Sequence, residues 1–215
     1  MIEVNVEKQY GKFFLKSSFL ASGIICITGR NGSGKTTLLN IIAGIIKPDA
    51  GYIKINGKDI TNLPIEKRKV AIITPDTYLP HMKVNRHITW GLKFKNDKTN
   101  DELKRIKEVL SIDFNKKLNS LSSGMRIRVA IATALFSYPE VILIDEALSY
   151  ISDRSQFMKN LFNEVLKMKI DLIFTTQYSE DCNLAQNCYQ MESGILKRID
   201  CKNFKQLSNH EPDIF

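Results

Sequence analysis

The chain lacks any long apolar segment. None of its hydrophobic runs approaches the ~18 residues that a helix needs to cross a bilayer. Residues 1–10 are charged and alternate with apolar positions, which is not the pattern of a secretory leader. We therefore expect a cytoplasmic protein, in which any role at a membrane needs a separate subunit.

Metal ligands and cysteine pairs are scarce. The 215 residues include four cysteines and three histidines, without a C-x-x-C pair, so we expect no zinc site. Cys26 lies in an apolar run and is interpreted as a small core residue. In a cytoplasmic chain the four thiols, Cys26, Cys182, Cys188 and Cys201, are expected to stay reduced.

A basic stripe interleaved with aromatic residues is also missing. The formal net charge is +8, which can indicate a nucleic-acid partner or an anionic membrane surface. The basic residues are spread along the chain in short clusters, such as 66–69 and 104–107, so no nucleic-acid partner is expected. Solvated lysines together with a site for a polyanion are the simpler explanation.

Internal repeats, low-complexity tracts and linkers are absent, and short apolar strands alternate with helical segments. This alternation predicts an α/β fold, with a mostly parallel sheet and helices on both faces. The strand-rich start predicts an added N-terminal antiparallel β part, and residues 80–120 predict a mainly helical lobe. The expected strands are 2–6, 13–20, 24–28, 52–55, 70–74, 141–145, 170–175, 188–191 and 195–199, and the expected helices are 37–46, 84–94, 101–110, 124–136 and 153–168.

The segment Gly29–Thr37 fits the phosphate-binding pattern G-x-x-x-x-G-K-[ST]. Glycines let successive backbone N–H groups turn towards a polyphosphate, and a lysine reaches its β- and γ-phosphates. A glycine-rich turn that merely contains lysine is the alternative, but a strand before it and a helix after it favour an anion site. The predicted ATP-binding residues are Asn31, Gly32, Ser33, Gly34, Lys35, Thr36 and Thr37, with Thr36 also a ligand of Mg²⁺.

A second motif supplies two carboxylates. The run Val141–Glu146 is four apolar residues followed by Asp145 and Glu146, which is the Walker B arrangement. We expect Asp145 to hold Mg²⁺ beside the P-loop and Glu146 to act as general base towards a water molecule. The alternative, a strand that ends in two solvated acids, is weak beside a P-loop.

A third motif distinguishes among the classes of P-loop protein. The run Leu121–Leu135 resembles the signature motif of ABC ATPases, and Gly124 lies 21 positions before Asp145 as in that family. The resemblance implies that Ser122, Ser123 and Gly124 contact the γ-phosphate of ATP held by a second subunit. It therefore implies a head-to-tail dimer, either a homodimer or a heterodimer with a second ABC ATPase subunit.

The resemblance covers residues 2–199. The stretches 63–70, 79–84 and 88–92 are similar to those of importer-type ABC ATPases, in which the helical lobe docks the membrane subunits. Tyr10 resembles the aromatic residue that stacks on adenine, although a strand-end core aromatic is the alternative. The implied organisation is one ABC-type ATPase domain: a RecA-like P-loop NTPase core (1–75 and 134–200), a helical subdomain (76–133) and a short tail (201–215).

Two residues of the hydrolysis machinery depart from the family. The Q-loop glutamine is missing, so Thr74, Pro75 or Asp76 takes its position, and Asp76 is a candidate Mg²⁺ ligand. Gln177 stands where the family has its switch histidine. Glutamine donates a hydrogen bond to a γ-phosphate but cannot carry a proton, and losing one well-placed donor lowers a rate by on the order of 10²-fold.

The signature and the D-loop also differ. The signature reads Ser-Ser-Gly-Met, with Ser123 and Met125 in place of glycine and glutamine, and the D-loop has Ser152 in place of aspartate. The resemblance implies an ATP-binding and ATP-hydrolysing subunit of an ABC transporter. It would couple ATP-driven dimerisation to solute transport by permease subunits, as a peripheral protein at the cytoplasmic membrane face. The altered residues indicate slow hydrolysis, and they keep open a soluble non-transport ABC-type ATPase or a weakly hydrolysing regulator.

Overall fold

In the computed structural model, the described residues are 1–90 and 97–201, and ten strands in these two ranges form one sheet. The strands are β1 (Ile2–Tyr10), β2 (Phe13–Ala21), β3 (Ile24–Thr28), β4 (Ala50–Ile55), β5 (Lys58–Asp59), β6 (Val70–Ile73), β7 (Val141–Asp145), β8 (Asp171–Thr176), β9 (Asn187–Glu192) and β10 (Ile195–Ile199). The α-helices are α1 (Lys35–Ala43), α2 (Val84–Ile88), α3 (Asp97–Val109), α4 (Ser123–Phe136) and α5 (Arg154–Lys167). Short 3-10 helices are η1 (Ile65–Lys67), η2 (Leu118–Ser120), η3 (Ala147–Tyr150) and η4 (Ser179–Leu184).

The sheet is parallel in one part and antiparallel in another. Its strand order is β5-β4-β1-β2-β10-β9-β3-β8-β7-β6. Strands β6, β7, β8, β3 and β9 pair in parallel, whereas β1 pairs antiparallel with both β2 and β4. This confirms the α/β prediction of a parallel sheet with an added N-terminal antiparallel part.

The central strands are buried on both faces. On β7, Ile142 and Ile144 join the core that contains α4 and α5, while Val141 and Leu143 join the core that contains α1. Successive side chains of a strand point to opposite faces, so a strand between two helical layers is apolar throughout. The carboxyl ends of β7 and β8 carry the polar side chains Asp145, Thr175 and Thr176, and a further one, Asp171, begins β8.

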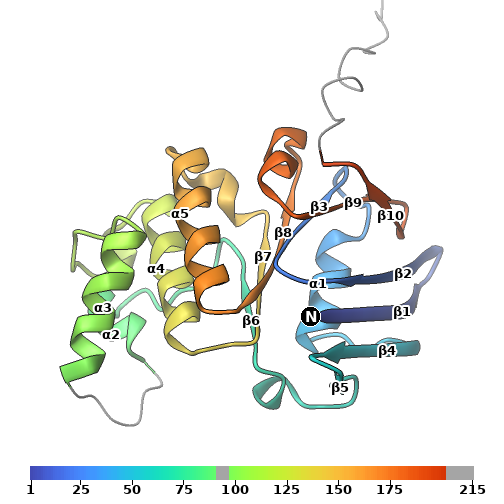
Figure 1. The fold of residues 1–215 in the computed structure, drawn as a ribbon, viewed down its shortest axis with the longest axis horizontal. Helices are drawn as coiled ribbons and strands as arrows, with labels where there is room; N and C mark the ends of the chain where they lie inside the picture. Colours follow the sequence, from blue (N-terminus) through green and yellow to red (C-terminus); the bar gives the residue numbers. More distant parts are fainter. Residues whose placement is uncertain (91–96, 202–215) are drawn as a thin grey trace, which may run out of the picture.

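Helices α2 to α5 gather beside the β6–β7 edge, and the antiparallel strands β1, β2 and β4 lie at the other end of the molecule (Figure 1). Helix α2 ends at Ile88, and residues 91–94 of the predicted helix lie outside the described residues, as do residues 202–215 of the predicted tail. Helix α3 begins at Asp97, earlier than predicted. No helix in the described ranges is long and apolar enough to cross a bilayer.

A buried arginine fixes the carboxyl end of α1. The guanidinium of Arg68, which is 5% exposed, donates hydrogen bonds to the carbonyls of Ile41 and Ile42 at 3.1 and 3.0 Å. It also donates to the carbonyls of Thr61 and Leu63 at 2.7 and 2.8 Å. The last carbonyls of a helix have no partner within the helix, so Arg68 replaces the missing donors.

The expectation that all thiols stay reduced is wrong for two of them. Cys188 and Cys201 form a disulfide, with their Cα atoms 5.5 Å apart. Strands β9 and β10 are an antiparallel pair in which Cys188 lies opposite Ile199, so Cys201 follows just beyond its partner strand. The sequence separation of 13 residues gave no sign of this proximity, because it results from the turn between β9 and β10.

Candidate nucleotide site

The P-loop lies between β3 and α1, where a backbone with positive φ is required. Gly32 has φ 76° and Gly34, directly before α1, has φ 112°, conformations that favour glycine. A Cβ atom on Gly34 would also lie 2.9 Å from Cζ of Phe13, on β2. The glycines thus let the loop close over the amino terminus of α1, where N–H groups without helical partners favour an anion.

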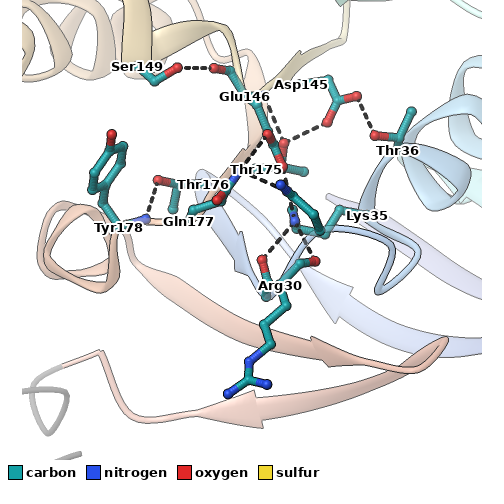
Figure 2. A network of polar contacts seen from close by, with 12 residues as sticks. Arg30, Lys35, Thr36, Asp145, Glu146, Ser149, Thr175, Thr176, Gln177 and Tyr178 are labelled. Carbon is teal, nitrogen blue, oxygen red and sulfur yellow. Dashed lines mark hydrogen bonds and ion pairs between the residues drawn. The ribbon is translucent and has the colours of Figure 1, made fainter. Parts of the chain in front are cut away.

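Lys35 is the most enclosed charged group of this loop, with 3% of its surface exposed. Its ammonium donates to the carbonyl oxygens of Gly29 and Arg30 at 2.7 and 3.0 Å. It also forms an ion pair with Glu146, at 3.0 Å between Nζ and Oε1 (Figure 2). An ammonium has three N–H donors, so three acceptors hold it in one position.

Asp145 is held by one hydroxyl on each side. Thr36 donates from Oγ1 to Oδ2 of Asp145 at 2.7 Å, and Thr175 donates to Oδ1 at 2.7 Å (Figure 2). Thr175 also accepts a bond from the backbone N–H of Glu146 at 2.9 Å. Asp145 and Thr175 are opposite each other in the β7–β8 register, a pairing that sequence reasoning missed.

Glu146 occupies a tight turn directly after β7. Its φ of 53° is left-handed, and its carbonyl accepts a hydrogen bond from the hydroxyl of Ser149 at 2.6 Å. Its carboxylate lies between Lys35 and Gln177, since Nε2 of Gln177 donates to Oε2 at 3.0 Å. The same amide group donates to Oδ1 of Asn31 at 2.8 Å, so Gln177 links the Walker B turn to the P-loop.

These groups line one cleft of about 660 Å³. Most of the residues predicted from the P-loop and Walker B motifs meet there, together with Gln177. The predicted residues that line the cleft are Asn31, Gly32, Gly34, Lys35, Thr36, Thr37, Asp145, Glu146 and Gln177. Pro75, one of the three candidates for the Q-loop position, also lines the cleft. Sequence reasoning had not assigned three others to the ATP site: Phe13, Ser149 and Tyr150.

Three predicted residues lie elsewhere. Tyr10, at the end of β1, is 45% exposed, and its ring centroid is 5.4 Å from Nζ of Lys8. Asp76 is exposed, and its neighbour Pro75 is the residue of that loop that lines the cleft. The hydroxyl of Ser33 is buried, 2.9 Å from where a Cβ of Gly29 would lie. The roles of Tyr10, Asp76 and Ser33 stay predictions.

The signature residues are not part of this cleft. Ser122 precedes α4, and its Oγ accepts a hydrogen bond from the N–H of Met125 at 3.3 Å. Ser122 and Ser123 are exposed, so the amino end of this helix is open to solvent. Gly124 packs beneath η3, where an added Cβ would lie 2.6 Å from the carbonyl oxygen of Tyr150.

The chain is similar in sequence to known ATP-binding proteins. Residues 15–149 match the family model described as ABC transporter. A probable sulfate/thiosulfate import ATP-binding protein, CysA of Chlorella vulgaris, is 31% identical over 98% of this chain and 94% of its own length. The molybdate/tungstate import ATP-binding protein WtpC of Archaeoglobus fulgidus is 34% identical over 92% of this chain and 88% of its own length.

A solved structure has the same fold. The protein cbiO1 from Clostridium perfringens, described as part of the ABC transporter complex cbiONQ, superposes with a TM-score of 0.81. It is 24% identical in sequence, and the superposition covers 94% of this chain and 88% of that protein. The chain therefore belongs to the ABC transporter family, as an ATP-binding subunit that hydrolyses ATP.

Proposed function

We propose that this chain is the motor subunit of an importer, bound peripherally to permease subunits at the cytoplasmic face of the membrane. The observation that carries the proposal is the convergence of Lys35, Asp145 and Glu146 in one cleft at the amino end of α1. A phosphate that binds there meets the Lys35 ammonium and the free N–H groups of the helix. Both relatives described above are named as import ATP-binding proteins.

Mg²⁺ fits the oxygen ligands at this end of the cleft. Thr36 and Asp145 offer a hydroxyl and a carboxylate oxygen 2.7 Å apart, and Mg²⁺ prefers such hard oxygen ligands. We infer that these two residues hold the ion, with Asp76 as a further candidate. The ion supplies positive charge against the β- and γ-phosphate oxygens.

Glu146 is the group that takes the proton from the attacking water. Its carboxylate is shared between the Lys35 ammonium and the Gln177 amide, so its orientation is fixed from two sides. A γ-phosphate at Lys35 competes with this carboxylate for the ammonium, and Glu146 then turns to the water. Gln177 keeps a donor near the phosphate but cannot exchange a proton, so we expect slow turnover.

The signature end supports a head-to-tail dimer. Ser122 and Ser123 are exposed at the start of the 14-residue helix α4, where a phosphate of ATP on a second subunit would bind. The second subunit is either another copy of this chain or a different ABC ATPase. We also propose that residues 76–133 are the subdomain that docks the permease, apart from a RecA-like core of residues 1–75 and 134–200.

The cargo that we propose is a tetrahedral oxyanion. The support is the names of the two relatives, which import sulfate or thiosulfate in one case and molybdate or tungstate in the other. Selection of the cargo would lie in the membrane and solute-binding subunits. The test is uptake of labelled sulfate and molybdate by vesicles that contain this chain with its permease, and uptake of neither would refute the cargo class.

The first experiment is steady-state phosphate release by the purified chain with Mg-ATP, with Lys35→Ala as the blank. Turnover above the blank supports a working homodimeric site. ATP binding with turnover at the blank level would refute the homodimer and leave a heterodimer or a nucleotide-dependent regulator. Pull-down with a permease that is encoded beside this chain then separates transport from regulation.

A further inference from the structure

All four cysteines of the chain converge on one place in the core, although they are far apart in sequence. Cys26 on β3 and Cys188 on β9 are register partners on neighbouring parallel strands. Cys182 belongs to η4, and Cys201 follows β10 and is bonded to Cys188. The cluster thus joins strand β3, which leads into the P-loop, to the segment that follows Gln177.

One disulfide and one pair of thiols lie side by side in this cluster. The sulfur atoms of Cys26 and Cys182 are 3.0 Å apart, and both residues are fully buried. The sulfur of Cys188 lies 3.2 Å from the carbonyl oxygen of Cys182. Cys188 is buried and Cys201 is half-buried, so external thiols would reach the cluster through Cys201.

The thiol pair is not suited to hold a metal. Tetrahedral zinc with bonds of ~2.3 Å places its sulfur ligands roughly 3.8 Å apart, farther than the two sulfurs here. Among the described residues no group of three or more histidine, cysteine or acidic side chains has a metal-binding arrangement. Two thiols in contact with each other beside a disulfide are instead placed for thiol–disulfide exchange.

The hydrogen bond between the two sulfurs makes them unequal. This contact lowers the pKa of the Cys182 thiol, and it raises the pKa of the Cys26 thiol, which burial raises further. The thiolate is the nucleophile in disulfide exchange. Cys182 is also the member of the pair whose backbone contacts the disulfide, since its carbonyl oxygen lies 3.2 Å from the sulfur of Cys188, and it is therefore the thiol placed to attack that disulfide.

We propose that this cluster is an internal thiol–disulfide exchange site, in which one disulfide moves between Cys188–Cys201 and Cys26–Cys182. The Cys182 thiolate attacks the sulfur of Cys188, forms a Cys182–Cys188 bond and releases the Cys201 thiolate. The Cys26 thiolate then attacks the sulfur of Cys182 and releases the Cys188 thiolate. The two protons of the original thiol pair end on Cys188 and Cys201, so no external oxidant or reductant is consumed.

The exchange has a mechanical consequence for the nucleotide site. A Cys26–Cys182 bond would join β3 to η4, and η4 follows Gln177, whose amide holds Glu146 at 3.0 Å. The turn from β8 into η4 is also held by a hydrogen bond from the hydroxyl of Thr176 to the carboxylate of Asp181 at 2.7 Å. We therefore expect the position of the disulfide to change ATP turnover. This consequence, unlike the exchange, rests on the proposed function of Glu146 and Gln177.

The test of the exchange uses the wild-type chain. The protein that carries the Cys188–Cys201 bond is incubated at neutral pH without added thiol or oxidant, quenched in acid, alkylated and digested without reduction, and its disulfide-linked peptides are quantified by mass spectrometry. We expect both Cys188–Cys201 and Cys26–Cys182 peptides, with about one disulfide per chain. Quantitative Cys188–Cys201 pairing without any Cys26–Cys182 peptide would overturn the proposal.

Sequence separation makes this test specific for the folded state. The candidate pair is 156 residues apart, whereas the observed disulfide spans 13 residues. Loop closure in an unfolded chain disfavours the longer pairing by about 40-fold, so scrambling after unfolding would seldom produce it. A sample oxidised in denaturant measures that background, and a Cys26–Cys182 yield no higher than this background would also overturn the proposal.

Two variants separate exchange from its effect on turnover. Cys201→Ser removes the internal disulfide, so the Cys26–Cys182 bond should not form without an added oxidant. Cys26→Ala keeps Cys188–Cys201 and blocks the second pairing, and thermal unfolding checks that both variants fold. We expect dithiothreitol to change phosphate release at least twofold in the wild type and not in Cys26→Ala. Cross-linked peptides without this difference would uphold the exchange and overturn its coupling to ATP turnover.

Discussion

The P-loop end and the signature end of this molecule differ in how far their polar groups are satisfied within one chain. At the P-loop, Lys35, Asp145 and Glu146 are all held by neighbours of the same chain. At the signature, Ser122 and Ser123 are exposed at the open end of α4. The first end is an assembled site, whereas the second is a surface whose donors await another molecule. The contrast fits the proposed head-to-tail dimer, in which one chain suffices to bind ATP and a second chain is needed for turnover.

The largest effect is expected at the assembled end. Lys35→Ala removes the buried ammonium that faces the predicted phosphates, and we expect ATP affinity to fall at least ~100-fold, or about 3 kcal/mol. Calorimetric titration with Mg-ATP measures the loss. Lys47→Ala is the matched control, because Lys47 is exposed beyond α1 and should leave affinity unchanged. Equal affinities for both variants would contradict the P-loop assignment.

The second largest effect is expected at Glu146, where a substitution should lower ATP turnover without lowering ATP binding. Glu146→Gln keeps the shape of the side chain but removes the general base, so turnover should fall ~10²- to 10⁴-fold while ATP stays bound. The trapped ATP should also hold the dimer closed, which light scattering under saturating Mg-ATP would detect. Glu140→Gln is the control, since Glu140 pairs with Lys69 outside the cleft. A monomer under these conditions would exclude the homodimer.

The sequence predicted the assembled end far better than the contacts that complete it. Lys35, Thr36 and Asp145 lie in short motifs whose local backbone positions them, so their convergence could be predicted. Thr175 reaches Asp145 only because β7 and β8 pair in one register, and periodicity within either strand does not encode that register. Phe13 enters the cleft through a similar long-range approach of β2 to the P-loop.

The fold shows the same division. The central strands were predicted because burial on both faces leaves a continuous apolar run in the sequence. Helices α4 and α5 were predicted because their buried faces leave apolar residues at helical spacing. The end of α2, the early start of α3 and the 3-10 helix η4 were missed, since the boundaries of short polar segments depend on tertiary contacts. The Cys188–Cys201 bond was missed because the compartment argument took precedence over strand pairing.

A smaller effect tests how the signature end is positioned. Gly124→Ala places a Cβ about 2.6 Å from the carbonyl oxygen of Tyr150, which should destabilise the fold by about 1–3 kcal/mol. In a helix without such a neighbour, glycine to alanine stabilises by up to ~1 kcal/mol, so the sign is diagnostic. Urea unfolding measures both this variant and the control Ser123→Ala, which is exposed and should change stability by less than about 0.5 kcal/mol. Stabilisation by Gly124→Ala would contradict this prediction, and it would mean that η3 can move away from α4 to make room for the added Cβ.

The smallest change in turnover is expected at Gln177. Gln177 donates to both Glu146 and Asn31, so it orients the base but contributes no proton of its own. Gln177→His restores an ionisable donor at that position, and we expect turnover to rise, by up to ~10²-fold if this donor alone limits the rate. Gln177→Ala, which removes both hydrogen bonds, should lower turnover and is the matched control in the same phosphate-release assay. If Gln177→His leaves the rate unchanged while Gln177→Ala lowers it, residue 177 contributes to turnover only by positioning Glu146. The limit on turnover would then lie at the open end, in Ser123 and Met125, or in the Q-loop at Pro75.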